Sequence, residues 1–147
     1  MIEPALYSSE KNDWETPDEF FDYWNRQFNF KMDVCANCNN YKVMPYLTES
    51  DNGLESPWLS PAWCNPPYGR EQVQWVQKAI YEQQNGVTTV MLLPSRTDTK
   101  MFHEYLYNRP MVSIRFIKGR LKFKGAESPA PFPSMIIIFW GYPLEEK

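Results

Sequence analysis

The chain has little of the chemistry that marks secreted, metal-binding or membrane proteins. Among its 147 residues there are one histidine and three cysteines, and no apolar run approaches the length of a membrane span. An odd cysteine count without a secretion signal predicts free thiols in a reducing compartment. Cys35, Cys38, Cys64 and His103 include the ligand types of a Cys3His zinc site, but a second closely spaced ligand pair is missing, so no metal is expected. We therefore expect a soluble cytoplasmic protein.

A strong net charge is also missing, since the balance is only −3. The distribution is uneven: residues 1–60 carry eleven acids and four Lys or Arg, whereas residues 61–147 carry seven acids and eleven Lys or Arg. The basic residues are densest, with no acid among them, at Arg115, Lys118, Arg120, Lys122 and Lys124. This split allows a basic DNA-facing side on an acidic protein. Solvated charges on a strand face would give the same pattern.

The most informative stretch is the tetrapeptide Asn65-Pro66-Pro67-Tyr68, which follows a short apolar run. Two prolines are incompatible with a helix interior or a central strand, and the residue before a proline favours an extended conformation. These features predict a rigid loop at the carboxyl end of a strand, where open α/β sheets have their ligand crevices. Such a loop can hold a flat amine: the Asn65 carbonyl and a backbone carbonyl accept from its NH2 group, and Tyr68 stacks on its ring. An ordinary proline turn is the alternative.

A capped helix and a strand are predicted before this motif. Thr16 suits the N-cap of the helix and Pro17 its first position, and Glu19 completes a capping box. Apolar residues follow at helical spacing, namely Phe20, Phe21, Trp24 and Phe28. Residues 28–36 alternate well enough to form a strand, with Asp33 near its carboxyl end, a common cofactor-contacting position. Residues 37–61 are irregular, and Asp51 lies in a turn signal.

The elements after the motif predict the carboxyl half of an α/β sandwich. Residues 71–84 have one apolar helical face, and residues 87–93 form a β-branched apolar run typical of a buried parallel strand. A short helix capped by Thr97 or Asp98 is expected next, followed by strands at residues 111–117 and 134–140. The elements of the carboxyl half thus follow the order βαβαββ. We expect one compact domain over residues 1–147 with a mostly parallel sheet, and a mobile arm at residues 1–13.

Several short motifs, read in order, resemble the phage-type DNA N6-adenine methyltransferase (Dam-type) family. They run from about residue 14 to about residue 140, and their order is far more specific than any single motif. The motifs are Trp14-Glu15-Thr16-Pro17, Asp33-Val34-Cys35-Ala36, residues 51–54, residues 63–68, residues 92–99, residues 119–123 and residues 131–134. The resemblance implies a trimmed class I methyltransferase (Rossmann-like) sandwich with an antiparallel last strand. It also implies S-adenosylmethionine as cofactor, adenine in DNA as substrate, and a phage or prophage source in a bacterial cytoplasm.

The resemblance further implies roles for individual residues. The catalytic residues would be Asn65, Pro66, Pro67 and Tyr68: the Asn65 side chain and the Pro66 carbonyl would accept from adenine N6, and Tyr68 would stack on a base flipped out of the duplex. Cofactor contacts are implied for Trp14, Thr16, Asp33, Ala36 and Asp51. Asp51 would accept from the cofactor's adenine amino group, unless it serves only its turn. The glycine-rich loop usual in such enzymes is absent, and Ala36 and Asn37 stand in its position.

DNA contacts are expected along one edge of the sheet, because the basic residues follow strands that should end on the same edge as Asn65. The expected contacts are Arg96, Thr97, Lys118, Arg120, Lys122 and Lys124, with Phe132 as a second stacking surface. The acidic amino-terminal part should face away or help to reject wrong registers. A chain this short could need a homodimer to grip DNA. The alternatives are an amino-methyltransferase acting on cytosine N4 or protein glutamine N5, and a non-catalytic DNA-binding module.

Overall fold

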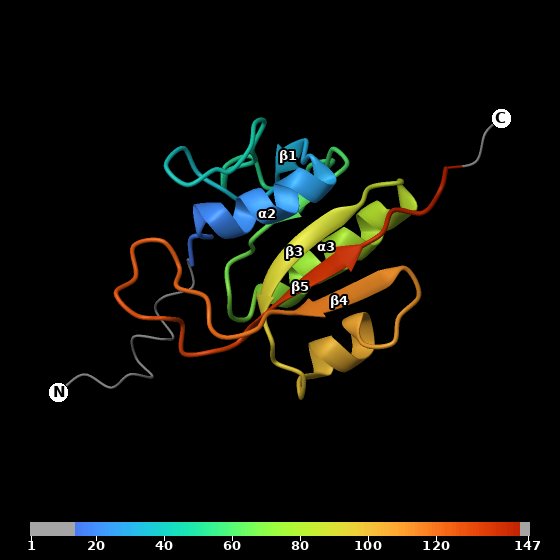
Figure 1. The fold of residues 1–147 in the computed structure, drawn as a ribbon. Helices are drawn as coiled ribbons and strands as arrows, with labels where there is room; N and C mark the ends of the chain where they lie inside the picture. The colour runs from blue at the N-terminus through green and yellow to red at the C-terminus, as the bar shows by residue number, and fades with distance from the viewer. Residues whose placement is uncertain (1–13, 145–147) are drawn as a thin grey trace.

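The computed structural model describes residues 14–144, so the arm expected at residues 1–13 lies outside the described residues. Its centre is a five-stranded sheet in the order β1-β2-β3-β5-β4 (Figure 1). The strands are β1 (Met32–Asp33), β2 (Ala62–Cys64), β3 (Thr89–Pro94), β4 (Val112–Phe116) and β5 (Ser134–Phe139). The helices are α2 (Asp18–Phe28), α3 (Gln72–Gln84) and the π-helix η1 (Phe102–Leu106).

The sheet topology confirms the predicted fold class. Strands β1, β2 and β3 are parallel, and β5 lies antiparallel between β3 and β4. Because β4 and β3 are each antiparallel to β5, β4 runs in the same direction as β3. The carboxyl ends of β1, β2, β3 and β4 therefore meet at one edge of the sheet, which we call the carboxyl edge.

Helices cover both faces of the sheet (Figure 1). All six residues of β3 and all six of β5 are buried, and their side chains alternate between two cores with the period of two that a pleated strand imposes. Val90 and Leu92 pack on the α2 side, whereas Met91 and Leu93 pack on the α3 side. No helix of the described residues is long and apolar enough to cross a bilayer.

Two predictions before the motif were wrong. The helix begins at Asp18 with Pro17 as its N-cap and has no side-chain cap hydrogen bond, because the Thr16 hydroxyl instead contacts the Asn65 amide. The expected strand over residues 28–36 shrinks to β1. Phe28, the first residue of the expected strand, belongs to α2, and Asn29 ends that helix in the left-handed conformation at φ 55°.

The helix after β3 is capped by a different residue from the one predicted. Thr97 and Asp98 do not cap the next helix; the backbone N–H of Phe102 donates to Thr99 Oγ1 at 3.2 Å. The helix itself is a five-residue π-helix, η1, and π-helical turns are frequent at functional sites. In this chain η1 buries Phe102 and Leu106 against the α3-side core, so its role in the described structure is packing.

Candidate active site

The Asn65 side chain is held by the segment that precedes α2. Its Nδ2 donates to the Trp14 carbonyl oxygen at 2.5 Å and to Thr16 Oγ1 at 3.0 Å. A carbonyl oxygen can only accept, so the amide NH2 must face Trp14 and its oxygen must face the other way. Asn65 Oδ1 is buried and has no hydrogen-bond partner among residues 14–144. An unpaired buried acceptor costs free energy, so it marks a position where a ligand N–H would be stabilised.

Tyr68 ends the motif inside an aromatic cluster. Its ring lies edge-on to Phe132 at 5.6 Å between centroids and to Phe123 at 6.4 Å. Trp14 completes the cluster, at 5.3 Å from Phe123 and 5.1 Å from Phe132. Tyr68 is 7% exposed and Phe132 is 8% exposed, so a base stacking on either ring would first have to part the cluster. Burial raises the pKa of Tyr68, and its hydroxyl donates weakly to the Leu92 carbonyl at 3.5 Å.

Asp33 closes β1 at the carboxyl edge, as the sequence predicted. It is 2% exposed, and its carboxylate accepts from the backbone N–H of Lys42 at 2.9 Å and of Cys35 at 3.3 Å. Burial raises the pKa of Asp33 to about 7, because two amide donors only partly replace the lost water. The following loop is tied down through Ala36, whose N–H donates to the Leu47 carbonyl at 2.9 Å.

Asp51 forms the turn that its sequence signal predicted. Its Oδ2 accepts from both the N–H and the hydroxyl of Thr48 at 2.9 Å, and these bonds lower the pKa of the exposed carboxyl. The turn lies against the end of β1. The backbone approaches so closely there that a Cβ at Gly53 would collide with the Val34 carbonyl oxygen. Asp51 is thus near the carboxyl edge, and its contact with a cofactor stays a prediction.

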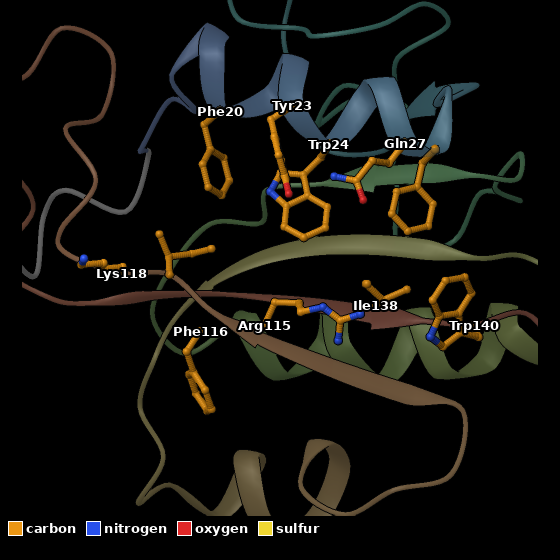
Figure 2. Close-up of a pocket in the computed structure, with 11 residues that line it drawn as sticks. Phe20, Tyr23, Trp24, Gln27, Arg115, Phe116, Lys118, Ile138 and Trp140 are labelled. Atoms are coloured by element: carbon orange, nitrogen blue, oxygen red, sulfur yellow. The ribbon is translucent and has the colours of Figure 1, made fainter.

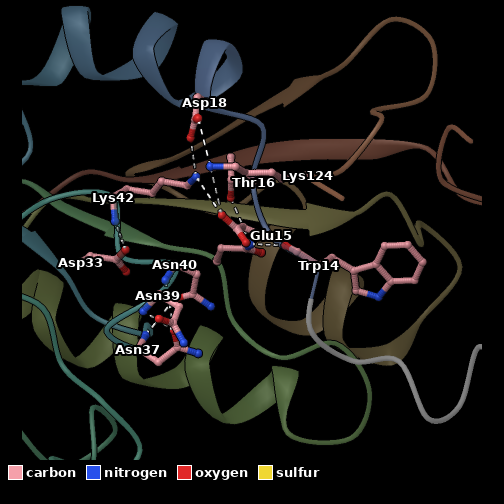
Figure 3. A network of polar contacts seen from close by, with 11 residues as sticks. Trp14, Glu15, Thr16, Asp18, Asp33, Asn37, Asn39, Asn40, Lys42 and Lys124 are labelled. Carbon is pink, nitrogen blue, oxygen red and sulfur yellow. Dashed lines mark hydrogen bonds and ion pairs between the residues drawn. The ribbon is translucent and has the colours of Figure 1, made fainter. Parts of the chain in front are cut away.

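A network of ion pairs anchors the segment that holds Asn65 (Figure 3). Lys42 Nζ lies 2.8 Å from Asp18 and 3.7 Å from Glu15, and Lys124 Nζ lies 3.2 Å from Asp18 and 3.6 Å from Glu15. The backbone N–H of Lys124 also donates to the Glu15 carbonyl at 2.9 Å. Hydrogen bonds from Lys42 and then Lys124 lower the pKa of Asp18. The expectation that the acidic amino-terminal part faces away was wrong here, since these two acids pair with the basic run.

The other basic residues lie around the carboxyl edge in different settings. The Arg96 guanidinium lies over the Phe132 ring, 6.0 Å from its centroid, and Arg120 Nη1 donates to the Ala130 carbonyl at 3.4 Å. Lys118 and Lys122 are exposed. The Thr97 carbonyl contacts His103 Nε2 at 2.8 Å. The fold thus brings residues 96–97 and 118–124 to the same edge as Asn65.

Two cysteines lie near this site: Cys64 directly precedes Asn65, and the Cys35 N–H donates to Asp33. Cys35 is half-buried, Cys38 is exposed and Cys64 is buried, and all three are free thiols. Within residues 14–144, no three His, Cys, Asp or Glu side chains are grouped so that they could hold a metal ion.

Sequence reasoning missed two site residues. Lys42 gave no motif signal, because its role depends on the fold of the irregular segment that returns it to Asp33 and Asp18. Phe123 belongs to a motif that resembles the family, but it lies between Lys122 and Lys124 and was treated only as part of the basic run. The bond between Thr16 and Asn65 joins residues 49 positions apart, which no local pattern encodes.

The described site falls inside a match to one protein family. A family model for DNA N-6-adenine-methyltransferase (Dam) matches residues 4–142. The chain is also 31% identical over 148 residues to a DNA N-6-adenine-methyltransferase of Haemophilus phage HP1 (strain HP1c1), covering 95% of this chain and 84% of that relative. The residues matched by the family model include the Asn65-Pro66-Pro67-Tyr68 loop. The chain therefore belongs to the Dam family of adenine-specific DNA methyltransferases.

Proposed function

We propose that the chain transfers a methyl group from S-adenosylmethionine to N6 of an adenine that has left the DNA stack. The observation that carries this proposal is the buried, unpaired Asn65 Oδ1 beside the conformationally fixed Pro66. Two acceptors, Asn65 Oδ1 and the Pro66 carbonyl, match the two hydrogens of an adenine amino group. The phage relative supports action on DNA in a bacterial cytoplasm.

The chemistry asked of these residues is orientation. The N6 lone pair of adenine is delocalised into the ring, so N6 is a poor nucleophile. Hydrogen bonds from N6 to the two acceptors favour a tetrahedral nitrogen. Its lone pair is then less delocalised into the ring, so N6 becomes a better nucleophile. The tether from Asn65 Nδ2 to Trp14 and Thr16 fixes the direction of Oδ1, so the alignment is built before the substrate arrives. After transfer, the methylated N6 carries a positive charge and releases one proton to solvent.

The groups at the carboxyl edge fit the proposed cofactor in their chemistry. S-adenosylmethionine, when bound, supplies a methyl group on a positively charged sulfonium and also carries an ammonium. Burial raises the pKa of the Asp33 carboxyl, and a cation placed beside it would favour its ionised form. Trp14, Thr16, Ala36 and Asp51 remain the further proposed contacts, all on segments next to the ends of β1 and β2.

Replacing Asp33 by asparagine should weaken binding of S-adenosylhomocysteine, which keeps the ammonium, by about tenfold.

For the wild-type protein, the affinity for S-adenosylhomocysteine should rise as pH increases through about 7, because Asp33 then ionises and attracts the cation. The same ionisation should make the ligand-free protein less stable as pH rises towards about 7, since the raised pKa favours the folded state only while Asp33 is protonated. Calorimetric titration with S-adenosylhomocysteine across pH measures the change in affinity.

The exposed Asp22 on α2 offers the control for this experiment. Asp22→Asn should bind as the wild type does at every pH. Equal affinity and an equal pH profile for Asp33→Asn would remove Asp33 from the cofactor site.

The direct test of the proposed function is methyl transfer from labelled S-adenosylmethionine to DNA, followed by nucleoside analysis. Label in N6-methyladenine is the expected result. Label in N4-methylcytosine, or transfer that does not require DNA, would assign the loop to another amine. DNA binding without any transfer would point to a non-catalytic module.

We further propose that the basic residues of the carboxyl edge contact the phosphates around the target. These are Arg96, Lys118, Arg120, Lys122 and Lys124. Thr97 would contact the DNA beside them, and Phe132 would support the flipped base once the aromatic cluster parts. Their common edge supports this proposal, because one duplex could reach them together with Asn65. We also keep the prediction that the chain forms a homodimer, because a chain this short could need a second copy to grip DNA.

The logarithm of the DNA association constant falls as the logarithm of the salt concentration rises. Lys122→Ala should make this slope less steep by about 0.9, as expected for one lost phosphate contact. Lys124→Ala should change that slope less, because its ammonium already pairs with Asp18 and Glu15. DNA affinity measured over a range of salt concentrations tests both. Lys31, which is exposed directly before β1 at the opposite edge of the sheet, provides a control. Slopes for Lys122→Ala that match the wild type would move the DNA surface elsewhere.

A further inference from the structure

A groove runs between α2 and the strands β4 and β5 (Figure 2). It has a volume of about 370 Å³. Helix α2 contributes aromatic rings from above, and the sheet contributes Arg115, Ile138 and Trp140 from below. The groove is lined by Phe20, Tyr23, Trp24, Gln27, Phe28, Arg115, Phe116, Ile117, Lys118, Ile138 and Trp140.

The groove combines exposed rings with unpaired positive charge. Tyr23 is 52% exposed and Trp140 is 38% exposed, so both rings offer free surface. Arg115 and Lys118 are its only charged lining residues, and neither forms an ion pair with an acid of residues 14–144. Apolar rings without cations would suit a hydrophobic partner, but two free cations among rings complement a polyanion that has flat apolar faces.

The direction of the groove relates it to the active site. Lys118 and Phe20 lie at one end, where β4 ends at the carboxyl edge and α2 begins close to Thr16 (Figure 2). Phe28 and Trp140 lie at the other end, where their ring centroids are 5.7 Å apart (Figure 2). Ile138 and Trp24 on its floor and wall belong to the same core as Tyr68, Phe123 and Phe132. The groove is thus continuous with the face on which the proposed catalytic loop lies.

We propose that this groove binds an unpaired, single-stranded segment of DNA that leads away from the flipped base. The proposal rests on the proposed function, because it assigns the path of the same substrate. Aromatic stacking combined with backbone cations is the usual way in which proteins hold single strands without reading their sequence. Tyr23 and Trp140 would stack on bases, while Arg115 and Lys118 would contact phosphates.

The experiment measures binding of a fluorescein-labelled oligothymidylate by fluorescence anisotropy at several salt concentrations. Tyr23→Ala should weaken binding by about tenfold, as expected for one lost stacking platform, and Tyr23→Phe should bind nearly as the wild type does. Arg115→Gln should lower the salt slope by about 0.7, the value for one phosphate contact of a single strand. Thermal unfolding checks that Tyr23→Ala is folded, and the exposed Arg115 provides a variant that leaves the ring packing intact.

Phe116 is the matched control. It borders the groove and is 61% exposed on the same strand as Arg115, but its ring points away from α2, to the opposite side of the sheet (Figure 2). Phe116→Ala should bind the probe as the wild type does. The proposal is overturned if Tyr23→Ala and Arg115→Gln both bind as the wild type does, or if Phe116→Ala weakens binding equally. It is also overturned if Tyr23→Ala turns a dimer into a monomer in sedimentation without changing probe affinity, since the groove would then hold a second copy.

The methyl-transfer assay separates this proposal from the proposed function. Loss of probe binding in Tyr23→Ala with no detectable transfer by the wild type on any DNA would support the groove and contradict the methyltransferase mechanism. Transfer to adenine together with unchanged probe binding in both groove variants would contradict the groove alone.

Discussion

Replacing Asn65 by alanine should abolish methyl transfer while cofactor affinity stays nearly intact. The variant loses the buried Oδ1 acceptor, which is aimed at the substrate amine and not at the cofactor. Removal of one preorganised hydrogen-bonding group from an active site typically costs about 10² to 10³ in turnover. Single-turnover transfer to DNA measures the loss, and calorimetric titration with S-adenosylhomocysteine measures the retained affinity.

Asn85 offers a matched control for this change. It is an exposed asparagine that follows α3, so Asn85→Ala should keep wild-type turnover. A folded Asn65→Ala protein with wild-type turnover would contradict the mechanism and leave an ordinary proline turn. A large loss of cofactor affinity would show instead that the tether to Trp14 and Thr16 organises the cofactor site, since both contacts end with the amide.

The sequence allowed β3 and the loop at residues 65–68 to be predicted because their signals are local. The two prolines after Asn65 restrict the backbone wherever the chain folds, and the apolar run before them can only be a buried strand. Residues 87–93 likewise anticipated β3, whose residues are all buried. The antiparallel insertion of β5 was predicted from the resemblance of the βαβαββ half to class I methyltransferases, and the sheet pairing confirms it.

The polar contacts of the site were not predictable in this way. A Thr-Pro pair before a helix favours an N-cap, but the buried Asn65 amide takes the Thr16 hydroxyl, and tertiary hydrogen bonding prevails over the local cap. Lys124 looked like a DNA contact because it belongs to a basic run. In the fold it pairs with Glu15 and Asp18, which lie more than 100 residues earlier in the chain. Charge counts give no information on such pairings.

Replacing Tyr68 by alanine should have the second largest effect, and its main cause should be a loss of stability. The ring is buried between Phe123 and Phe132, so its removal leaves a cavity in the aromatic cluster. Truncation of a buried aromatic side chain costs about 3–5 kcal/mol in the free energy of unfolding. This is a large part of the roughly 5–15 kcal/mol that stabilises a typical domain. Chemical denaturation measures the loss, and the exposed Tyr107→Ala, at 59% exposure, should show little change.

Tyr68→Phe then separates stacking from packing and from the chemistry of the hydroxyl. The variant keeps the ring and loses only the weak bond to the Leu92 carbonyl at 3.5 Å, so its free energy of unfolding should fall by less than about 1 kcal/mol. If the ring supports the flipped adenine, turnover of Tyr68→Phe should stay close to the wild type at a temperature where both proteins are folded. Burial raises the pKa of the hydroxyl, so it stays protonated near neutral pH and is unsuited to act as a base. A large loss of turnover in a stable Tyr68→Phe protein would contradict the stacking role and assign the hydroxyl a direct hydrogen bond to the substrate, because packing and protonation would both be unchanged.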